Sequence, residues 1–511
     1  MKRLITALVA ALLFVAPVPA AAAVAPDEVL TDKGWLRGTS TPAEREFLGV
    51  PFAAPPVGAL RWRAPRPAAP WTGVRPATEP SDWCAQGGAE PSTDEDCLYL
   101  NVYTPPSGPA GLPVLVWFHG GAFIIGRATL YDGAELAKRA NAVVVTTNYR
   151  LGVFGFLAHP ALRAEDAVGN GNYGIMDQQA ALRWVRDNIA AFGGNPGNVT
   201  IFGESAGGGS VCTHLVAPSS AGLFHRAVMQ SGSCMHQEIS VAELNGVDFS
   251  GDVFCRRPLD PAGSLACMRG RSAQDLLTAV AWDPFDTLLL RYKPNYGGGL
   301  LPRPWKEVVA SGQHNKVPVI MGTNLDEGRV FVHYIAPQPI DLAAYRGLLF
   351  LLFNVNAGRV EREYPGAAYG GDHRLALSAA VTDWIFACPA SRLATALPAV
   401  RFYEFTDRNA PVLPGIPPAD WLGAYHGAEL PYLFTWPGVT LTPDQTVLSD
   451  QMVGYWAEFA RRGDPNGGGR PNWPTFAGRN VLNLEPDNVI PRTDFDARHK
   501  CAFWTTVPEF A

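Results

Sequence analysis

The sequence has few charged residues and no run of lysines and arginines. Only 17% of its 511 residues are charged, and the formal net charge is −6 at pH 7. Nucleic-acid binding requires a concentrated basic face, so no nucleic-acid partner is expected. Beyond the N-terminal region there is no stretch of about 18 consecutive apolar residues, which argues against an integral membrane segment in the mature chain.

Metal-binding motifs are also missing. The sequence has no Cys-x-x-Cys pair, no His-Glu-x-x-His motif and no group of histidines near a cysteine. We therefore expect no metal and no other cofactor. The sequence lacks internal repeats and long low-complexity linkers, while 47% of its residues are hydrophobic and 11% are aromatic. This composition allows a large core and predicts one large domain rather than a disordered or fibrous chain.

The N-terminus has the pattern of a secretory signal. Basic residues at positions 2 and 3 precede an apolar run from Leu4 to Val18, and four alanines follow one residue later. We expect a signal peptide at residues 1–23 and a mature chain over residues 24–511. No twin-arginine pair and no nearby cysteine occur, so the expected route is Sec-type export of a secreted, extracellular protein. An uncleaved anchor helix is the alternative, and the shortness of the apolar run disfavours it.

The cysteine content fits an oxidising destination. A bond between the first two cysteines would close a loop of 12 residues, and one between the fifth and sixth would close a loop of 11. Spacing alone leaves roughly 100 ways of pairing eight cysteines, so the pairing stays open at this point. The eight positions are Cys84, Cys97, Cys212, Cys234, Cys255, Cys267, Cys388 and Cys501.

Short apolar runs alternate with helical patterns along the chain. Met176, Ala180 and Trp184 repeat every fourth residue and predict an amphipathic helix that stops at the glycines beginning with Gly193. Alternating strands and helices predict an α/β protein with a mostly parallel central sheet flanked by helices. The runs predicted as strands are Pro113–His119, Ala142–Thr147, Val199–Phe202, Ala227–Gln230, Pro318–Met321 and Val400–Phe405.

One further segment, Leu342–Leu352, is strongly apolar. Its composition fits either the lining of a channel to the functional site or a helix packed in the core. Periodicity does not separate these two interpretations, because nearly every position is apolar. We favour a core helix.

The five residues from Gly203 to Gly207 (Gly-Glu-Ser-Ala-Gly) follow the predicted strand Val199–Phe202 and precede a helical stretch. A Gly-x-Ser-x-Gly pattern in this context predicts a sharp strand-to-helix turn that presents the hydroxyl of Ser205 as a nucleophile. The glycines make room for the turn, and the helix N-terminus favours developing negative charge. The pattern alone also fits an ordinary glycine-rich turn, so the prediction depends on its context.

A serine nucleophile needs a base and an acid that orients the base. Among the eight histidines after Ser205, His426 stands out because it lies in a loop beyond the predicted strand Val400–Phe405. The acid is expected after an earlier strand, where Asp326 and Glu327 are neighbours. Spacing alone does not choose between these two carboxylates.

An oxyanion hole needs backbone N–H groups close to the nucleophile. Ala206, directly after the candidate serine, is expected to supply one of them. The segment from His119 to Phe123 (His-Gly-Gly-Ala-Phe) follows a predicted strand and is expected to supply the others. Its small residues let the backbone approach a substrate oxygen, although a purely structural turn would have a similar composition.

Three longer motifs point to a known family. They are Phe192–Pro196 continuing to Gly203–Gly208, Glu95–Val102 and Phe47–Pro56. In this order they resemble the type B carboxylesterases, the cholinesterase-like branch of the α/β-hydrolases. The resemblance spans about residues 34–504 and implies an α/β-hydrolase fold in a single large domain.

The resemblance also implies roles for individual residues. It selects Glu327 over Asp326 as the acid. The matching positions are the nucleophile Ser205, the acid Glu327, the base His426, the oxyanion donors Gly121, Ala122 and Ala206, and Ser231, which lies outside the triad and supports the acid. The implied disulfides are Cys84–Cys97, Cys255–Cys267 and, in longer-bridged members, Cys388–Cys501, while Cys212 and Cys234 have no implied role.

Two departures from the family pattern matter. The third glycine of the oxyanion segment is replaced by Ala122, which keeps the N–H group but adds a methyl. The loop between Cys84 and Cys97 has no aromatic residue, whereas cholinesterases carry there a tryptophan that contacts choline. A specialist for choline esters is therefore not expected.

These observations predict a serine carboxylic-ester hydrolase that forms an acyl-enzyme on a small-molecule ester. Arginine outnumbers lysine 34 to 7, which favours a GC-rich genome, and we expect a secreted bacterial carboxylesterase. A non-catalytic binding protein of the same family is one alternative, and a lipase acting at an oil–water interface is another. The sequence predicts neither the natural ester nor the oligomeric state.

Overall fold

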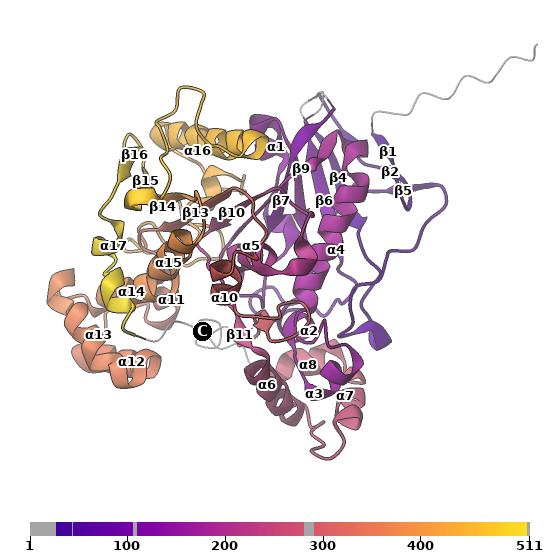
Figure 1. Ribbon diagram of the computed structural model, residues 1–511, viewed down its shortest axis with the longest axis horizontal. Coiled ribbons are helices and arrows are strands. Elements are labelled where there is room, and N and C mark those ends of the chain that lie inside the picture. Colours follow the sequence, from indigo (N-terminus) through magenta and orange to yellow (C-terminus); the bar gives the residue numbers. More distant parts are fainter. Residues whose placement is uncertain (1–26, 43, 106–109, 281–290, 508–511) are drawn as a thin grey trace, which may run out of the picture.

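A large central sheet organises the computed structural model, which describes residues 27–42, 44–105, 110–280 and 291–507. The sheet has 11 strands in the order β16-β15-β14-β13-β10-β9-β7-β8-β6-β4-β3 (Figure 1). Their bounds are β3 (Thr39–Ser40), β4 (Arg45–Pro51), β6 (Tyr99–Thr104), β7 (Leu112–Phe118), β8 (Val143–Thr147), β9 (Gly194–Glu204), β10 (Arg226–Gln230), β13 (Val319–Asn324), β14 (Arg401–Phe405), β15 (Val481–Leu484) and β16 (Ile490–Arg492). The predicted signal peptide at residues 1–23 lies outside the described residues.

The middle of the sheet is parallel and its margins are antiparallel. From β8 across β7, β9, β10, β13 and β14 to β15, each neighbouring pair runs in parallel. The outer pairs β3–β4, β4–β6, β6–β8 and β15–β16 are antiparallel. The predicted α/β class with a mostly parallel central sheet is confirmed.

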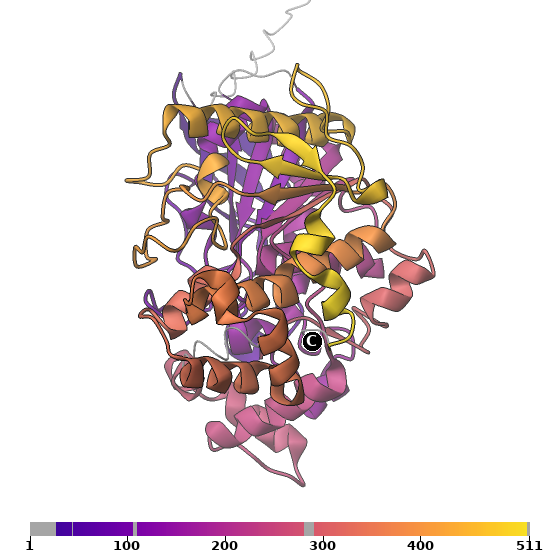
Figure 2. The same ribbon diagram turned by 90° about the vertical axis from the view of Figure 1, so that its left-hand side faces the viewer.

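Strand β7 explains why the sheet is covered on both faces. Its side chains alternate between two cores, with Val114, Val116 and Phe118 on one face and Leu115 and Trp117 on the other. A continuous apolar run is the pattern of a strand buried on both sides. The helices that contribute to these cores, which can be followed in Figures 1 and 2, are α4 (Tyr173–Asn188) and α5 (Ala206–Val216) for the first face, and α1 (Ala134–Ala140) and α16 (Pro443–Arg462) for the second.

Each of the six runs predicted as strands corresponds to a strand of the central sheet. The predicted amphipathic helix is α4, and a short 3-10 turn, Ile189–Phe192, extends it. One boundary was wrong: β9 already begins at Gly194, inside the segment predicted only to stop the helix. Gly193 has a φ of 88° and ends the helical turn, so the chain reverses there and pairs with β7 at once.

The apolar segment Leu342–Leu352 forms α12 (Leu342–Phe353), but only one of its faces is in the core. Tyr345, Leu349 and Phe353 are buried, whereas Phe350 and Leu351 are 64% and 62% exposed. The prediction of a core helix is therefore correct for one face and wrong for the other. No helix of the described ranges combines the length and the apolar character needed to cross a membrane.

Four disulfides join the eight cysteines. The three pairs implied by the resemblance are present, namely Cys84–Cys97, Cys255–Cys267 and Cys388–Cys501. The two unassigned cysteines, Cys212 and Cys234, form the fourth, with their Cα atoms 5.2 Å apart. This bond ties α5, which begins directly after Ser205, to the segment that follows β10.

Candidate active site

Ser205 occupies a strained turn between β9 and α5. Its φ is 60° and its ψ is −122°, a conformation that residues other than glycine rarely adopt. A Cβ atom on Gly203 would lie 2.6 Å from the carbonyl oxygen of Phe118, and one on Gly207 would lie 1.9 Å from it. The turn therefore requires glycine on both sides, and it presents a partly exposed serine at the start of a buried helix.

The predicted oxyanion segment lies against this turn. A Cβ atom on Gly120 would lie 3.1 Å from Cβ of Ser205, so the two backbones are in direct contact. Gly121 and Ala122 both have positive φ, at 105° and 56°. Among the described residues, no group accepts a hydrogen bond from the N–H of Gly121, Ala122 or Ala206. Three backbone donors beside the serine are thus available to a substrate oxygen.

Glu327 and His426 form a short polar contact in the site. Oε2 of Glu327 lies 2.6 Å from Nδ1 of His426, while its Oε1 accepts a hydrogen bond of 2.7 Å from the N–H of Asn324. Glu327 is fully buried and sits at the start of α11 (Gly328–Ile335). Since an ionised carboxylate only accepts hydrogen bonds, Nδ1 carries the proton and Nε2 is the basic atom of the neutral ring.

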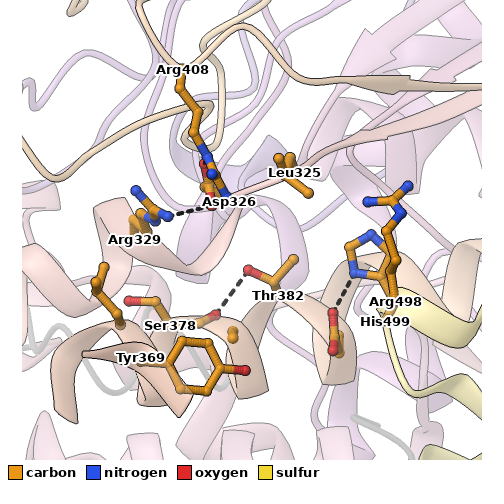
Figure 3. A pocket seen from close by; sticks show the side chains of 12 residues that line it. Leu325, Asp326, Arg329, Tyr369, Ser378, Thr382, Arg408, Arg498 and His499 are labelled. Atoms are coloured by element: carbon orange, nitrogen blue, oxygen red, sulfur yellow. Dashed lines mark hydrogen bonds and ion pairs between the residues drawn. The ribbon is translucent and has the colours of Figure 1, made fainter. Parts of the chain in front are cut away.

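Asp326 faces the other way. It forms ion pairs with Arg329 at 2.7 Å and with Arg408 at 2.8 Å, beside a separate cavity of about 380 Å³ (Figure 3). Its carboxylate is therefore paired with two arginines and does not contact His426. Of the two carboxylates between which spacing did not choose, Glu327 is the one that contacts His426.

Two further carboxylates, which the sequence analysis did not single out, surround the histidine. Oε1 of Glu204 lies 3.1 Å from Nε2 of His426. Glu429 accepts hydrogen bonds from Asn324 at 2.6 Å and from Gln230 at 3.2 Å. Within the described ranges, no lysine or arginine pairs with Glu204, Glu327 or Glu429. The sequence did carry a signal for these two carboxylates, because Glu204 directly precedes Ser205 and Glu429 follows His426 by three residues.

Ser231, implied as a support of the acid, lies directly after β10. It has a φ of 49°, and its N–H donates to the carbonyl of Gly322 at 2.8 Å. Its hydroxyl is buried and forms no hydrogen bond with any residue that the structure describes. Its support of Glu327 stays a prediction.

Comparison with known proteins agrees with this geometry. The family model described as the carboxylesterase family matches residues 25–504. The chain belongs to the carboxylesterase family. It is an enzyme of the α/β-hydrolase fold that hydrolyses carboxylic esters.

Mammalian esterases are among the relatives of this carboxylesterase. The chain is similar to a cocaine esterase from Homo sapiens, with 37% identity over 518 residues that cover 92% of this chain and 88% of the relative. It is 36% identical to the pyrethroid hydrolase Ces2e of Rattus norvegicus, over 91% of this chain and 86% of that protein. It is 35% identical to an acylcarnitine hydrolase of Mus musculus, over 91% of this chain and 87% of that one.

The buried carboxylates control the charge of the histidine. Burial disfavours the imidazolium, but Glu204 and Glu327 outweigh it and raise the pKa of His426 to about 9. Burial likewise raises the pKa of Glu204 to about 8, although His426 opposes this shift. Nε2 of His426 and Oε1 of Glu204 lie 3.1 Å apart without the alignment of a hydrogen bond, so Glu204 acts on the ring through its charge. The rings of Phe331 and Phe386, at 5.0 and 4.7 Å, shield His426 from water.

The assignment of the acid is tested by two neighbouring substitutions. We expect Glu327→Gln to lower kcat by about 10³-fold or more, because an amide cannot hold His426 in the required tautomer. Asp326→Asn should keep kcat within about 5-fold and lower the melting temperature, because it leaves two arginines without their carboxylate. Steady-state kinetics and thermal unfolding of both variants measure the difference. A larger loss of kcat in Asp326→Asn would contradict the assignment.

The carboxylate cluster predicts the pH dependence. His426 acts as a base only when it is neutral, so kcat/KM should fall as the pH drops through its raised pKa, above the usual 6.5. Glu204→Gln removes one stabilising charge and should move this acid limb to lower pH by about 1 to 3 units. The measurement is kcat/KM for an uncharged ester from pH 5 to pH 10. A flat profile from pH 5 to pH 8, or an unmoved limb in the variant, would be evidence against this account.

Proposed function

We propose that Ser205, His426 and Glu327 form the catalytic triad of this carboxylesterase, and that Gly121, Ala122 and Ala206 form its oxyanion hole. The observation that carries the proposal is the 2.6 Å contact between Glu327 and His426 beside a strained serine turn. The three N–H groups, which have no acceptor among the described residues, also support it.

The proposed reaction proceeds through an acyl-enzyme. Oγ of Ser205 attacks the ester carbonyl carbon while its proton moves to Nε2 of His426, and the carbonyl oxygen becomes an oxyanion held by the three N–H groups. The intermediate collapses, the C–O bond to the alcohol breaks, and His426 returns the proton to the leaving alkoxide. Water then attacks the acyl-enzyme by the same steps, which releases the carboxylic acid and regenerates the serine. Glu327 orients the ring and stabilises the imidazolium in each half.

The proposed substrates are small carboxylic esters. The names of the relatives refer to cocaine, pyrethroids and acylcarnitine, and we extend to this chain only the general class of small-molecule substrates. Choline esters are not proposed, because the loop between Cys84 and Cys97 contains no aromatic residue that would bind a quaternary ammonium group.

We further propose that this carboxylesterase is secreted, from a bacterial source. The N-terminal pattern of a basic pair, an apolar run and alanines supports export, and the arginine-rich composition supports the source. Four disulfides fit an oxidising compartment. Expression of the full chain in a bacterium should release into the medium a protein whose N-terminal sequence begins near Val24. Retention of an unprocessed chain in the cell membrane would contradict secretion.

Replacement of the nucleophile tests the mechanism itself. We expect Ser205→Ala to lower kcat by at least about 10³-fold, leaving only the catalysis provided by the oxyanion hole and by binding. With a nitrophenyl ester, whose good leaving group makes acylation faster than hydrolysis of the acyl-enzyme, the unmodified enzyme should release a burst of nitrophenol equal to the number of active sites. The variant should give no burst. Near-normal turnover by Ser205→Ala would exclude Ser205 as the nucleophile.

A further inference from the structure

A single buried asparagine at the end of β13 contacts the acid Glu327 and both ends of the loop that carries His426, but not the histidine ring itself. The N–H of Asn324 donates to Oε1 of Glu327 at 2.7 Å. Its side-chain nitrogen donates to Oε2 of Glu429 at 2.6 Å and to the carbonyl oxygen of Tyr425 at 2.8 Å. Tyr425 directly precedes His426, so this amide binds both ends of the short loop that carries the base.

We propose that Asn324 is a positioning residue of the hydrolytic site: it fixes the acid Glu327, the loop of His426 and the buried Glu429 relative to one another. This inference rests on the proposed triad and adds to it a residue that does not touch the substrate.

The chemistry of the carboxamide suits this task. One nitrogen carries two N–H groups, and both are directed at acceptors that cannot donate, the carbonyl of Tyr425 and the carboxylate of Glu429. The orientation of the amide is set by these acceptors, since the opposite orientation would place its oxygen against both. In the observed orientation its Oδ1 is buried and has no hydrogen-bond donor among the described residues. A buried acceptor without a partner is costly and persists where another requirement outweighs it.

The electrostatics of the cluster give the amide a second effect. Burial and the charge of Glu327 raise the pKa of Glu429, whereas the hydrogen bonds from Asn324 and Gln230 lower it. The net effect is a raised pKa of Glu429, and these neutral donors oppose that shift without placing a cation beside His426. Without the donors the pKa of Glu429 would rise further, and a protonated Glu429 would itself donate and compete for the acceptors that hold the loop.

The test compares two substitutions of Asn324 with a matched control. Asn324→Leu keeps the branched shape of the side chain, with a larger volume, and removes both side-chain donors. We expect kcat to fall by about 10²-fold, the cost of a small displacement of a catalytic group, with KM changed by less than about 3-fold. The control is Asn483→Leu in β15, which is also buried and also loses its side-chain hydrogen bonds, with Thr406, with the carbonyl of Asn488 and with Glu485. It should lose stability but keep kcat within about 3-fold.

The variant Asn324→Asp is tested by its pH profile of activity, which a purely structural role of Asn324 would leave unchanged. A protonated aspartic acid donates one hydrogen bond to Glu429, whereas an ionised aspartate repels it. Below the pKa of His426 both enzymes should lose activity as the pH falls, but this variant should also lose activity as the pH rises and the aspartic acid ionises, an alkaline limb that the unmodified enzyme lacks. The titratable groups that face the cluster in the described chain are Glu204, Glu327, His426, Glu429 and the hydroxyls of Tyr131, Tyr403 and Tyr425.

The outcomes separate this inference from the proposed function. If Asn324→Leu folds and retains kcat within about 3-fold of the unmodified enzyme, Asn324 is not a positioning residue. If Asn324→Leu does not fold, the profile of Asn324→Asp decides, and the absence of an alkaline limb overturns the inference. The proposed triad is judged on its own by the nitrophenol burst of the unmodified enzyme, which does not depend on any substitution of Asn324.

Discussion

The contact between the end of β7 and the start of α5 is the constraint on which the site depends. The carbonyl oxygen of Phe118 lies where side chains on Gly203 or Gly207 would be, so the two backbones meet without any Cβ atom between them. This contact fixes Ser205 and the segment from His119 to Phe123 by backbone atoms alone. Backbone groups held by a parallel sheet are preorganised before the substrate arrives, which is the condition for strong stabilisation of an oxyanion. The strain of Ser205 is tolerated because the surrounding sheet determines the turn.

The second element of the site is an excess of buried negative charge. Glu204, Glu327 and Glu429 surround a single imidazole, and no described cation pairs with any of them. Such a cluster would be costly for folding, since ionised groups lose their hydration on burial. In the proposed reaction it becomes useful when His426 takes the proton of the serine, because the imidazolium then forms beside groups of opposite charge. The cost in the resting enzyme is reduced by the amide donors to Glu429.

The sequence predicted those features that depend on local rules. The six strands, the turn at Ser205 and the position of the oxyanion segment follow from apolar runs and from glycine spacing, which are local properties. Spacing left the choice between Glu327 and Asp326 open and only the family resemblance selected Glu327, because both follow β13 and the three-dimensional arrangement sends one to His426 and the other to Arg408. The pairing of Cys212 with Cys234 was not predicted at all, since it depends on how α5 packs beside the segment after β10. The exposed face of α12 escaped prediction because a uniformly apolar helix gives no sign of which side is covered.

The use of amides rather than cations around Glu429 follows from the needs of the base. An arginine beside Glu429 would satisfy that carboxylate more strongly than Asn324 and Gln230 do. It would also place a positive charge near His426, lower the pKa of the ring and destabilise the imidazolium that the reaction requires. Neutral donors avoid this conflict, because they bind the carboxylate and add no net charge. The site therefore combines a strong requirement for hydrogen bonds with an exclusion of cations, and asparagine and glutamine are the side chains that meet both conditions.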